Sequence, residues 1–280
     1  MADIVECHRR NDAGASRLFV YDDGWDKVKG YAPRALDSVV LKPGEMDKLV
    51  HDVDKFKNGM ARYRRLGIPY HRGYLLYGPP GTGKTSLVSA LAARFKMSVY
   101  LVNLTDFNDK TLVKAIKDVP PSSVIVFEDI DCVKTGRARS DAGTPARKQQ
   151  ENPGEKPDPL DQFSVTLSGL LNALDGFNAP EEVLFVMTTN KVEALDEALL
   201  RPGRIDYRLY MGAACDEQKI ELYLRFFPGA SGLDAKVFVE RHRSAETMAE
   251  FQGVLLRLEQ GEGGDSTSRR ASSPDILLRL

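Results

Sequence analysis

Short apolar runs alternate with helix-like segments along the chain from residue 37 to residue 211. Five runs have the Val-, Leu- and Tyr-rich composition of buried strands, namely 73–77, 98–104, 122–129, 183–189 and 207–211. Apolar residues recur at helical spacing in the segments 84–95, 109–119, 163–176 and 192–200. Continuous apolar strands separated by helices predict the α/β class, with a doubly wound parallel sheet covered on both faces.

The flanking segments have other patterns. Two apolar runs around the turn Asp22-Asp23-Gly24 predict a hairpin at the end of an N-terminal segment, 1–32. The α/β domain is expected over 33–212, and its stretch 134–161, rich in Gly, Pro and charges, is expected to be a mobile insertion. Helical spacing over 213–260 predicts a small C-terminal helical domain, and 261–280 has the composition of a flexible tail.

The composition is that of an ordinary globular protein, with 42% hydrophobic and 28% charged residues and a formal net charge of -1. This balance gives no reason to expect a nucleic-acid partner. Cys7, Cys132 and Cys215 lack the spacing of a zinc site. Because we find neither a membrane-spanning run nor a signal peptide, we expect a cytoplasmic location and no membrane attachment encoded in this chain. A membrane-associated or mitochondrial location is the alternative if the chain is part of a longer protein.

The stretch GPPGTGKT, residues 78–85, lies between a predicted strand and a predicted helix, as a phosphate-binding loop does. Its glycines let backbone N–H groups turn toward a phosphate, and the helix adds the positive end of its dipole. Lys84 is expected to reach the β- and γ-phosphates of ATP, and Thr85 to bind Mg²⁺.

A predicted buried strand ends in two acids, Glu128 and Asp129, in the reverse of the usual Asp-Glu order. Because successive side chains of a strand point to opposite faces, position decides the role of each acid. Glu128 is expected to face the magnesium at Thr85, and Asp129 to face the water that attacks ATP. Asn190, at the end of the run 183–189, is expected beside Asp129 and could hold the same water.

Arg201 and Arg204 are three residues apart across a Pro-Gly turn, which predicts exposed side chains on the rim of the domain. We expect no nearby acid to pair with either guanidinium. Such a pair suits the γ-phosphate of ATP bound to a neighbouring subunit. A solvated or locally paired basic turn is the alternative interpretation.

Together these motifs resemble the AAA family of ring ATPases, in which GPPGTGKT, LSGLLNALDG, TTN and LDEALLRPGRID occur in this order. The resemblance covers about residues 17–259. More narrowly, GIPYHRGYLLYGPPGTGKTS, the reversed acids in FEDID and FQGVLL are similar to a mitochondrial subfamily that assembles the cytochrome bc complex by moving the folded Rieske iron–sulfur protein. The reversed order is usual in that subfamily, which supports a working site.

This resemblance implies a P-loop ATPase fold with a five-stranded parallel sheet and a helical lid. It also implies a homo-oligomeric ring, hexamer or heptamer, with ATP and Mg²⁺ between subunits and adenine near 67–69. The catalytic residues that it implies are Asp129, Glu128, Lys84, Asn190, Arg201 and Arg204. The nucleotide-binding residues that it implies are Gly78, Pro79, Pro80, Gly81, Thr82, Gly83, Lys84, Thr85 and Ser86.

Three features depart from the family pattern. We find no counterpart of the subfamily's membrane helix, and only the hairpin in 1–32 corresponds to the end of its substrate-side domain. In the predicted lid, SAETMAEFQG stands where other AAA proteins have Ser-Gly-Ala-Asp, so we assign no lid sensor.

The leading hypothesis is an ATP-hydrolysing ring that remodels or moves a protein client. A nucleotide-gated scaffold with little turnover is a second hypothesis, which the shorter acid at position 129 permits. A third is a DNA-handling ATPase whose contacts would be the insertion 134–161 and Arg62, Arg64, Arg65 and Arg72. Given the overall charge, a solvated face is the better interpretation of these arginines.

Phe107 lies after the second predicted strand of the sheet, where ring ATPases that thread unfolded chains carry an aromatic residue and a glycine. Here Phe107 stands between polar residues, has no adjacent Gly and is followed at once by a predicted helix. We therefore expect Phe107 to pack inward and the client to be moved without threading.

Overall fold

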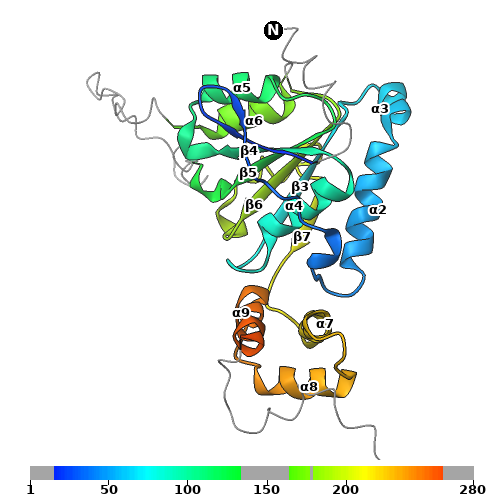
Figure 1. The fold of residues 1–280 in the computed structure, drawn as a ribbon. Helices are drawn as coiled ribbons and strands as arrows, with labels where there is room; N and C mark the ends of the chain where they lie inside the picture. The colour runs from blue at the N-terminus through cyan, green and yellow to red at the C-terminus, as the bar shows by residue number, and fades with distance from the viewer. Residues whose placement is uncertain (1–15, 134–163, 177–178, 261–280) are drawn as a thin grey trace, which may run out of the picture. The chain divides into compact units, whose positions relative to one another are not determined.

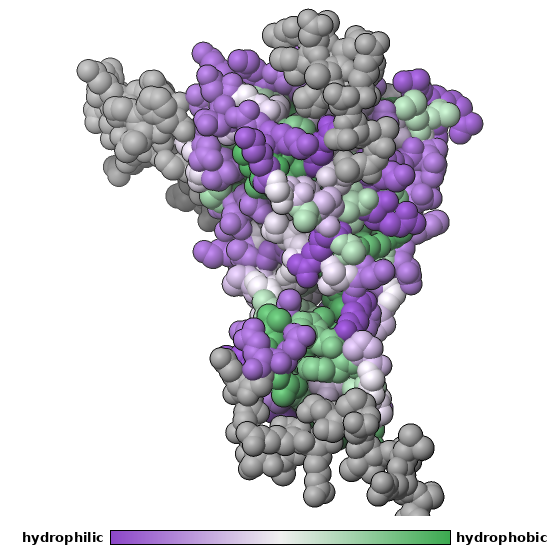
Figure 2. Space-filling model, viewed as in Figure 1, coloured by the Kyte–Doolittle hydropathy of each residue, from purple (hydrophilic) through white to green (hydrophobic). Residues whose placement is uncertain are grey.

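The structure is a computed structural model, and it describes residues 16–133, 164–176 and 179–260. The chain divides into two compact units, Met1–Gly212 and Ala213–Leu280 (Figure 1). The predicted insertion 134–161 and tail 261–280 lie outside the described residues. In the view of Figure 2 the surface of the first unit is mostly hydrophilic, which agrees with the concentration of its apolar side chains in the core.

One seven-stranded sheet forms the centre of the first unit. Its strands are β1 (Leu18–Tyr21), β2 (Trp25–Lys27), β3 (His71–Tyr77), β4 (Ser98–Asn103), β5 (Ser123–Glu128), β6 (Val183–Thr189) and β7 (Tyr207–Tyr210). The spatial order is β2-β1-β4-β5-β6-β3-β7, and every neighbouring pair is parallel except β1 with β2. The α/β prediction is confirmed. Because parallel strands end at the same edge, the segments after β3, β5 and β6 meet there.

The hairpin raises the number of strands from the expected five to seven. β1 pairs in parallel with β4, so the hairpin continues the sheet. The rings of Phe19 and Tyr100 stack at 4.7 Å, and Trp25 Nε1 donates a hydrogen bond to the Ala115 carbonyl at 2.8 Å. These contacts bury an apolar face that an isolated hairpin cannot bury by itself.

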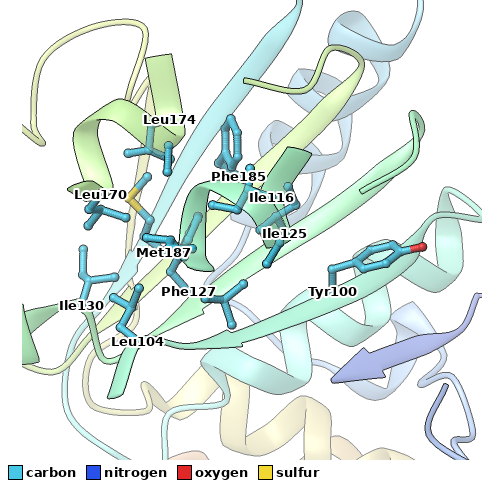
Figure 3. Packing of buried hydrophobic residues seen from close by; sticks show 14 of the residues in the cluster. Tyr100, Leu104, Ile116, Ile125, Phe127, Ile130, Leu170, Leu174, Phe185 and Met187 are labelled. Atoms are coloured by element: carbon cyan, nitrogen blue, oxygen red, sulfur yellow. The ribbon is translucent and has the colours of Figure 1, made fainter. Parts of the chain in front are cut away.

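Helices cover both faces of the sheet. In the first unit they are α2 (Glu45–Lys57), α3 (Met60–Leu66), α4 (Lys84–Arg94), α5 (Asp109–Lys117) and α6 (Leu167–Asp175), with the 3₁₀ helices η1 (Leu36–Ser38), η2 (Leu104–Asp106), η3 (Ile130–Cys132) and η5 (Val192–Ala194). On the α5 and α6 side, Leu170 packs with Phe127 and Phe185 of the sheet (Figure 3). On the opposite side, α2 and α4 pack against Val126 and Leu184.

Three helical segments differ from the sequence prediction, namely the expected helix 192–200 and the unpredicted helices α2 and α3. The expected helix 192–200 contains only η5 followed by turns, because Asp196 Oδ1 accepts the Ala198 N–H at 2.8 Å and favours a local turn. α2 was not predicted, although it buries Leu49, Val53 and Phe56 at helical spacing.

The second unit consists of α7 (Asp216–Phe226), α8 (Gly232–Arg241) and α9 (Met248–Glu259). Ser231 and Thr247 begin α8 and α9 through capping boxes, which explains why α9 starts at Met248. Val239 and Phe251 are buried and give this unit its own apolar core.

Candidate functional site

The loop between β3 and α4 has the backbone of a phosphate cradle. Gly78, Gly81 and Gly83 have φ values of 136°, 76° and 96°, which side-chain-bearing residues rarely adopt. At Gly78 a Cβ atom would lie 2.2 Å from the Met211 carbonyl oxygen. The glycines are therefore required for this turn, which ends at the N-terminus of α4, where backbone N–H groups favour an anion.

Lys84 lies at the centre of the cradle. Its Nζ donates to the carbonyls of Gly78 at 2.7 Å and Pro79 at 2.9 Å, and to Asn190 Oδ1 at 2.7 Å. Burial lowers the pKa of the Lys84 ammonium, and the negative charge of Asp129 opposes this shift. The ammonium is thus held beside the loop in a position to receive phosphate oxygens.

The two acids after β5 contact different groups. Thr85 Oγ1 donates to Glu128 Oε1 at 3.0 Å, whereas Asn190 Nδ2 donates to Asp129 Oδ1 at 3.3 Å. The reason differs from the expected strand alternation: β5 ends at Glu128, and Asp129 has a left-handed backbone with φ of 47°. This turn, which Asp tolerates, directs the second acid away from the first.

Sequence reasoning missed a third acid of this loop as a structural partner of the site. Asp131 Oδ1 accepts a hydrogen bond from Thr189 Oγ1 at 2.8 Å, and the Thr189 carbonyl accepts the Gly78 N–H at 3.2 Å. The Thr189 side chain also accepts the Lys191 N–H at 2.9 Å. Thr189 therefore joins the phosphate loop, the acid loop and the segment after β6. The sequence signal for this partner was the acid itself, Asp131, which stands two residues after the pair.

The rim arginines differ from the expectation that no acid pairs with them. Arg204 forms an ion pair with Asp175, in which Nη2 and Oδ2 are 2.7 Å apart, and its Nη1 donates to the Ala198 carbonyl at 2.7 Å. The expectation is therefore wrong for Arg204, because Asp175 at the end of α6 lies beside it in space. Arg201 is exposed, and its side chain has no ion pair or hydrogen bond with other described residues.

The backbone of the arginine turn is fixed against β3. A Cβ atom on Gly73 would lie 1.6 Å from the Arg204 carbonyl oxygen, so only glycine permits this approach. Asp206 accepts hydrogen bonds from the Gly73 N–H at 3.1 Å and the Gly203 N–H at 2.8 Å. Arg201 thus projects from a rigid turn.

The segment 67–69, near which the resemblance implied an adenine contact, does not line the pocket at the phosphate loop. It precedes β3, whereas the phosphate loop follows β3. The strand has seven residues, which separates its ends by about 20 Å. The structure therefore does not support the expected adenine contact at 67–69.

One of the four arginines considered as DNA contacts, Arg72, is paired with an acid in the structure. Arg72 Nε and Nη2 each donate to Asp52 at 2.7 Å, and Tyr74 donates to the same carboxylate at 2.8 Å. Arg72 therefore belongs to an internal ion pair and is not a free cation for a phosphate backbone.

A single pocket combines these groups. It is lined by the phosphate loop, by Glu128 and Asp129, and by Thr188 and Asn190 from the end of β6. Among the described residues, no three His, Cys, Asp or Glu side chains converge to hold a metal by themselves. The hydroxyl of Thr85 and the carboxylate of Glu128 nevertheless suit Mg²⁺, which takes its remaining oxygens from phosphates and water.

Residues 74–213 match the family model described as ATPase family associated with various cellular activities (AAA). The chain belongs to the AAA family. Its AAA domain contains the phosphate loop, both acids, Asn190 and the arginine turn, and carries the family's ATPase chemistry.

Relatives of this AAA protein include named mitochondrial chaperones. It is 42% identical over 248 residues to the probable mitochondrial chaperone bcs1 of Schizosaccharomyces pombe, and the aligned region covers 86% of this chain and 51% of the relative. It is 39% identical over 228 residues to mitochondrial chaperone BCS1 of Danio rerio, and the aligned region covers 80% of this chain and 52% of the relative. An AAA-ATPase of Arabidopsis thaliana is 35% identical over 253 residues, and the aligned region covers 83% of this chain and 47% of the relative.

The AAA protein described here spans about half the length of the curated relatives that it matches. The expected cytoplasmic location is contradicted by the names of several of these relatives, which are mitochondrial chaperones. Within the described part of the chain, we find no helix with the length and apolar character needed to cross a bilayer.

Proposed function

We propose that this protein is a Mg²⁺-dependent ring ATPase that remodels or moves a protein client. The observation that carries the proposal is two sets of side-chain hydrogen bonds that line one pocket: Thr85 to Glu128, and Lys84 to Asn190 to Asp129. The set brings together the groups needed to bind phosphate, hold a metal and position water.

Each side chain has a separate role in this proposal. Lys84 neutralises the β- and γ-phosphates, and Thr85 and Glu128 hold Mg²⁺, which supplies positive charge to the phosphate oxygens when it is bound. Asp129 accepts a proton from water as the water oxygen bonds to the γ-phosphorus. The bond between that phosphorus and the β–γ bridging oxygen breaks, and ADP and phosphate leave. Asn190 orients the water through its amide.

A homo-oligomeric ring of six or seven subunits completes the site in this proposal. Arg201 is exposed on a turn held by Asp206, so it is available to the γ-phosphate of ATP on a neighbouring subunit. Arg204, paired with Asp175, fixes the turn that presents Arg201. We assign the finger to Arg201 and the positioning role to Arg204.

The client is a protein, moved in mitochondria by opening and closing of the ring without threading. The relatives named mitochondrial chaperones support the kind of client and the location. Phe107 is 2% exposed and its ring centroid lies 4.9 Å from that of Tyr21, so it packs inside the first unit. A side chain in this position is not available to grip a passing chain.

Steady-state ATP hydrolysis measured over a range of protein concentrations tests the proposed ring. We expect specific activity to rise with concentration as subunits assemble and then reach a plateau, with Mg²⁺ required throughout. Assembly with ATP but without turnover would support the nucleotide-gated scaffold instead. Specific activity independent of concentration, in a protein that stays monomeric, would contradict an interface site.

The mode of client movement is tested with a tagged, stably folded fluorescent reporter that the ring binds. We expect ATP-dependent engagement without loss of fluorescence. Processive loss of fluorescence that Phe107→Ala abolishes would contradict movement without threading. Because Phe107 is buried, the melting temperature of the variant is the necessary control.

A further inference from the structure

Arg34 contacts the helix that follows the phosphate loop, although it lies 50 residues earlier than Lys84 in the sequence. Its Nη1 donates to Ser86 Oγ at 3.1 Å, and its Nε donates to Ser38 Oγ at 2.8 Å. One turn further along α4, the hydroxyls of Tyr31 and Ser89 are 2.7 Å apart. The segment 31–38 therefore lies along α4, and the guanidinium is at the end nearest the loop.

The position of Ser86 indicates which part of a bound nucleotide would face the Arg34 guanidinium. It is the third residue of α4 and lines the same pocket as Glu128 and Asp129. In a phosphate loop, Lys84 and Thr85 serve the β- and γ-phosphates and the metal, while backbone N–H groups of the loop and first helical turn surround the α- and β-phosphates. A cation at Ser86 is thus on the α-phosphate side of the pocket.

The partners of Arg34 leave its charge uncompensated within the described structure. Both are neutral hydroxyls, at Ser38 and Ser86. Two other half-buried arginines of the unit are paired with acids: Arg72 with Asp52 and Arg204 with Asp175. A guanidinium held by neutral groups beside a phosphate pocket retains its capacity for a charge-assisted, two-point contact with an anion.

We propose that Arg34 is a nucleotide-binding residue that contacts the α-phosphate of ATP and ADP from outside the phosphate loop. This inference rests on the proposed function, because it requires nucleotide in the pocket of the same chain. It predicts that the segment joining the hairpin to the α/β domain forms part of the nucleotide site.

The experiment measures equilibrium binding of ATP, ADP and inorganic triphosphate to the full chain and to Arg34→Gln. We expect affinity for all three to fall about ten-fold or more, because a charge-assisted contact to a phosphate is lost. Arg34→Lys keeps the charge and loses the two-point geometry. Its affinity for each ligand is therefore expected to lie between that of the unsubstituted protein and that of Arg34→Gln. Tyr31→Phe is the matched control, because it loosens the same segment from the same helix without changing charge, and its affinities should stay at the unsubstituted level.

Each other outcome counts against the inference. Equal affinities of Arg34→Gln and the unsubstituted protein would overturn it while leaving the ATPase proposal intact. A loss for ATP and ADP but not for inorganic triphosphate would assign Arg34 to the sugar or base instead. An equal loss in Tyr31→Phe would mean that Arg34 only fastens the segment to α4. Absence of nucleotide binding in the unsubstituted protein would refute the proposed function and the inference together.

Discussion

Lys84 of the phosphate loop donates a 2.7 Å hydrogen bond to Asn190 at the end of β6. The bond joins the loop after β3 to the segment after the parallel neighbour β6, so the cation assigned to phosphate and the amide assigned to water are held together in the unliganded fold. Their separation is set by the sheet, whose strand ends are rigidly spaced.

Lys84→Ala tests the phosphate-binding end of this pair. The substitution removes the only side-chain cation that the structure places within the loop, so we expect ATP affinity to fall about 100-fold or more. Isothermal titration measures the loss, and thermal unfolding with and without ATP gives an independent measure, since bound ligand stabilises only the folded state. An ATP affinity of Lys84→Ala equal to that of the unsubstituted protein would contradict the assignment of residues 78–85 as a phosphate-binding loop.

Glu128→Gln tests the metal end of the site. Its Oε1 accepts the Thr85 hydroxyl at 3.0 Å, so the carboxylate faces the hydroxyl that is assigned to Mg²⁺. Loss of the negative charge should raise the Mg²⁺ concentration needed for half-maximal hydrolysis about ten-fold or more, with activity recovering at high Mg²⁺. The same Mg²⁺ requirement in variant and unsubstituted protein would contradict the assigned role.

Arg201→Ala tests whether the site is shared between subunits. We expect normal ATP binding and a fall in turnover of about 10³-fold, because the finger acts only on the developing charge of a neighbour's γ-phosphate. Mixing this variant with Asp129→Asn protein should restore part of the activity, since some interfaces then combine an intact finger with an intact acid. No recovery at any ratio, with mixed assembly confirmed, would argue for a finger acting within one chain.

His71 provides a prediction about stability and pH. It is 7% exposed, neither ring nitrogen has a hydrogen-bond partner among the described residues, and its ring packs against Phe185. Burial lowers the pKa of His71 from its ordinary value of 6.5, with Asp206, Asp175 and Glu181 opposing the shift. The folded state therefore favours the neutral ring, and this contribution is complete above pH 6.5 and declines as the pH falls below that value.

Replacement by an uncharged ring isolates this effect. We expect the difference in free energy of unfolding between the native protein and His71→Phe to change below pH 6.5, in the direction that favours the variant at acid pH. The slope of that difference cannot exceed about 1.4 kcal/mol per pH unit, the limit for one proton. Urea unfolding at several pH values measures it, and a difference that stays constant from neutral to acid pH would contradict a buried neutral histidine.

The strands and the phosphate loop were predictable because their signals are local. Buried parallel strands are short apolar runs, and the glycines of the loop meet a backbone requirement that other residues rarely satisfy. The contact of Asp175 with Arg204 and that of Arg34 with Ser86 join residues 29 and 52 positions apart. No sequence pattern encodes such contacts, because they depend on how α6 and the segment 31–38 pack on the sheet.

The reversed acids show a second limit of sequence reasoning. Strand alternation correctly separated Glu128 from Asp129, but the physical cause is a left-handed turn at Asp129 after the strand has ended. A different local effect acts in the predicted helix 192–200, where the Asp196 side chain accepts a hydrogen bond from the Ala198 N–H and caps a turn. Side-chain bonds to nearby backbone groups redirect the chain within one or two residues, which a hydrophobic pattern does not record.

We propose above all that the reversed pair, Glu128 and Asp129, forms a working hydrolytic site in which Asp129 accepts the proton of the attacking water. Single-turnover hydrolysis of bound, γ-labelled ATP by Asp129→Asn, with Mg²⁺ present and assembly confirmed, tests it most directly. We predict that the variant keeps ATP and Mg²⁺ bound while its hydrolysis rate falls about 10²- to 10⁴-fold, because an amide cannot take the proton. Hydrolysis at the unsubstituted rate, or loss of ATP binding in place of loss of turnover, would contradict the claim.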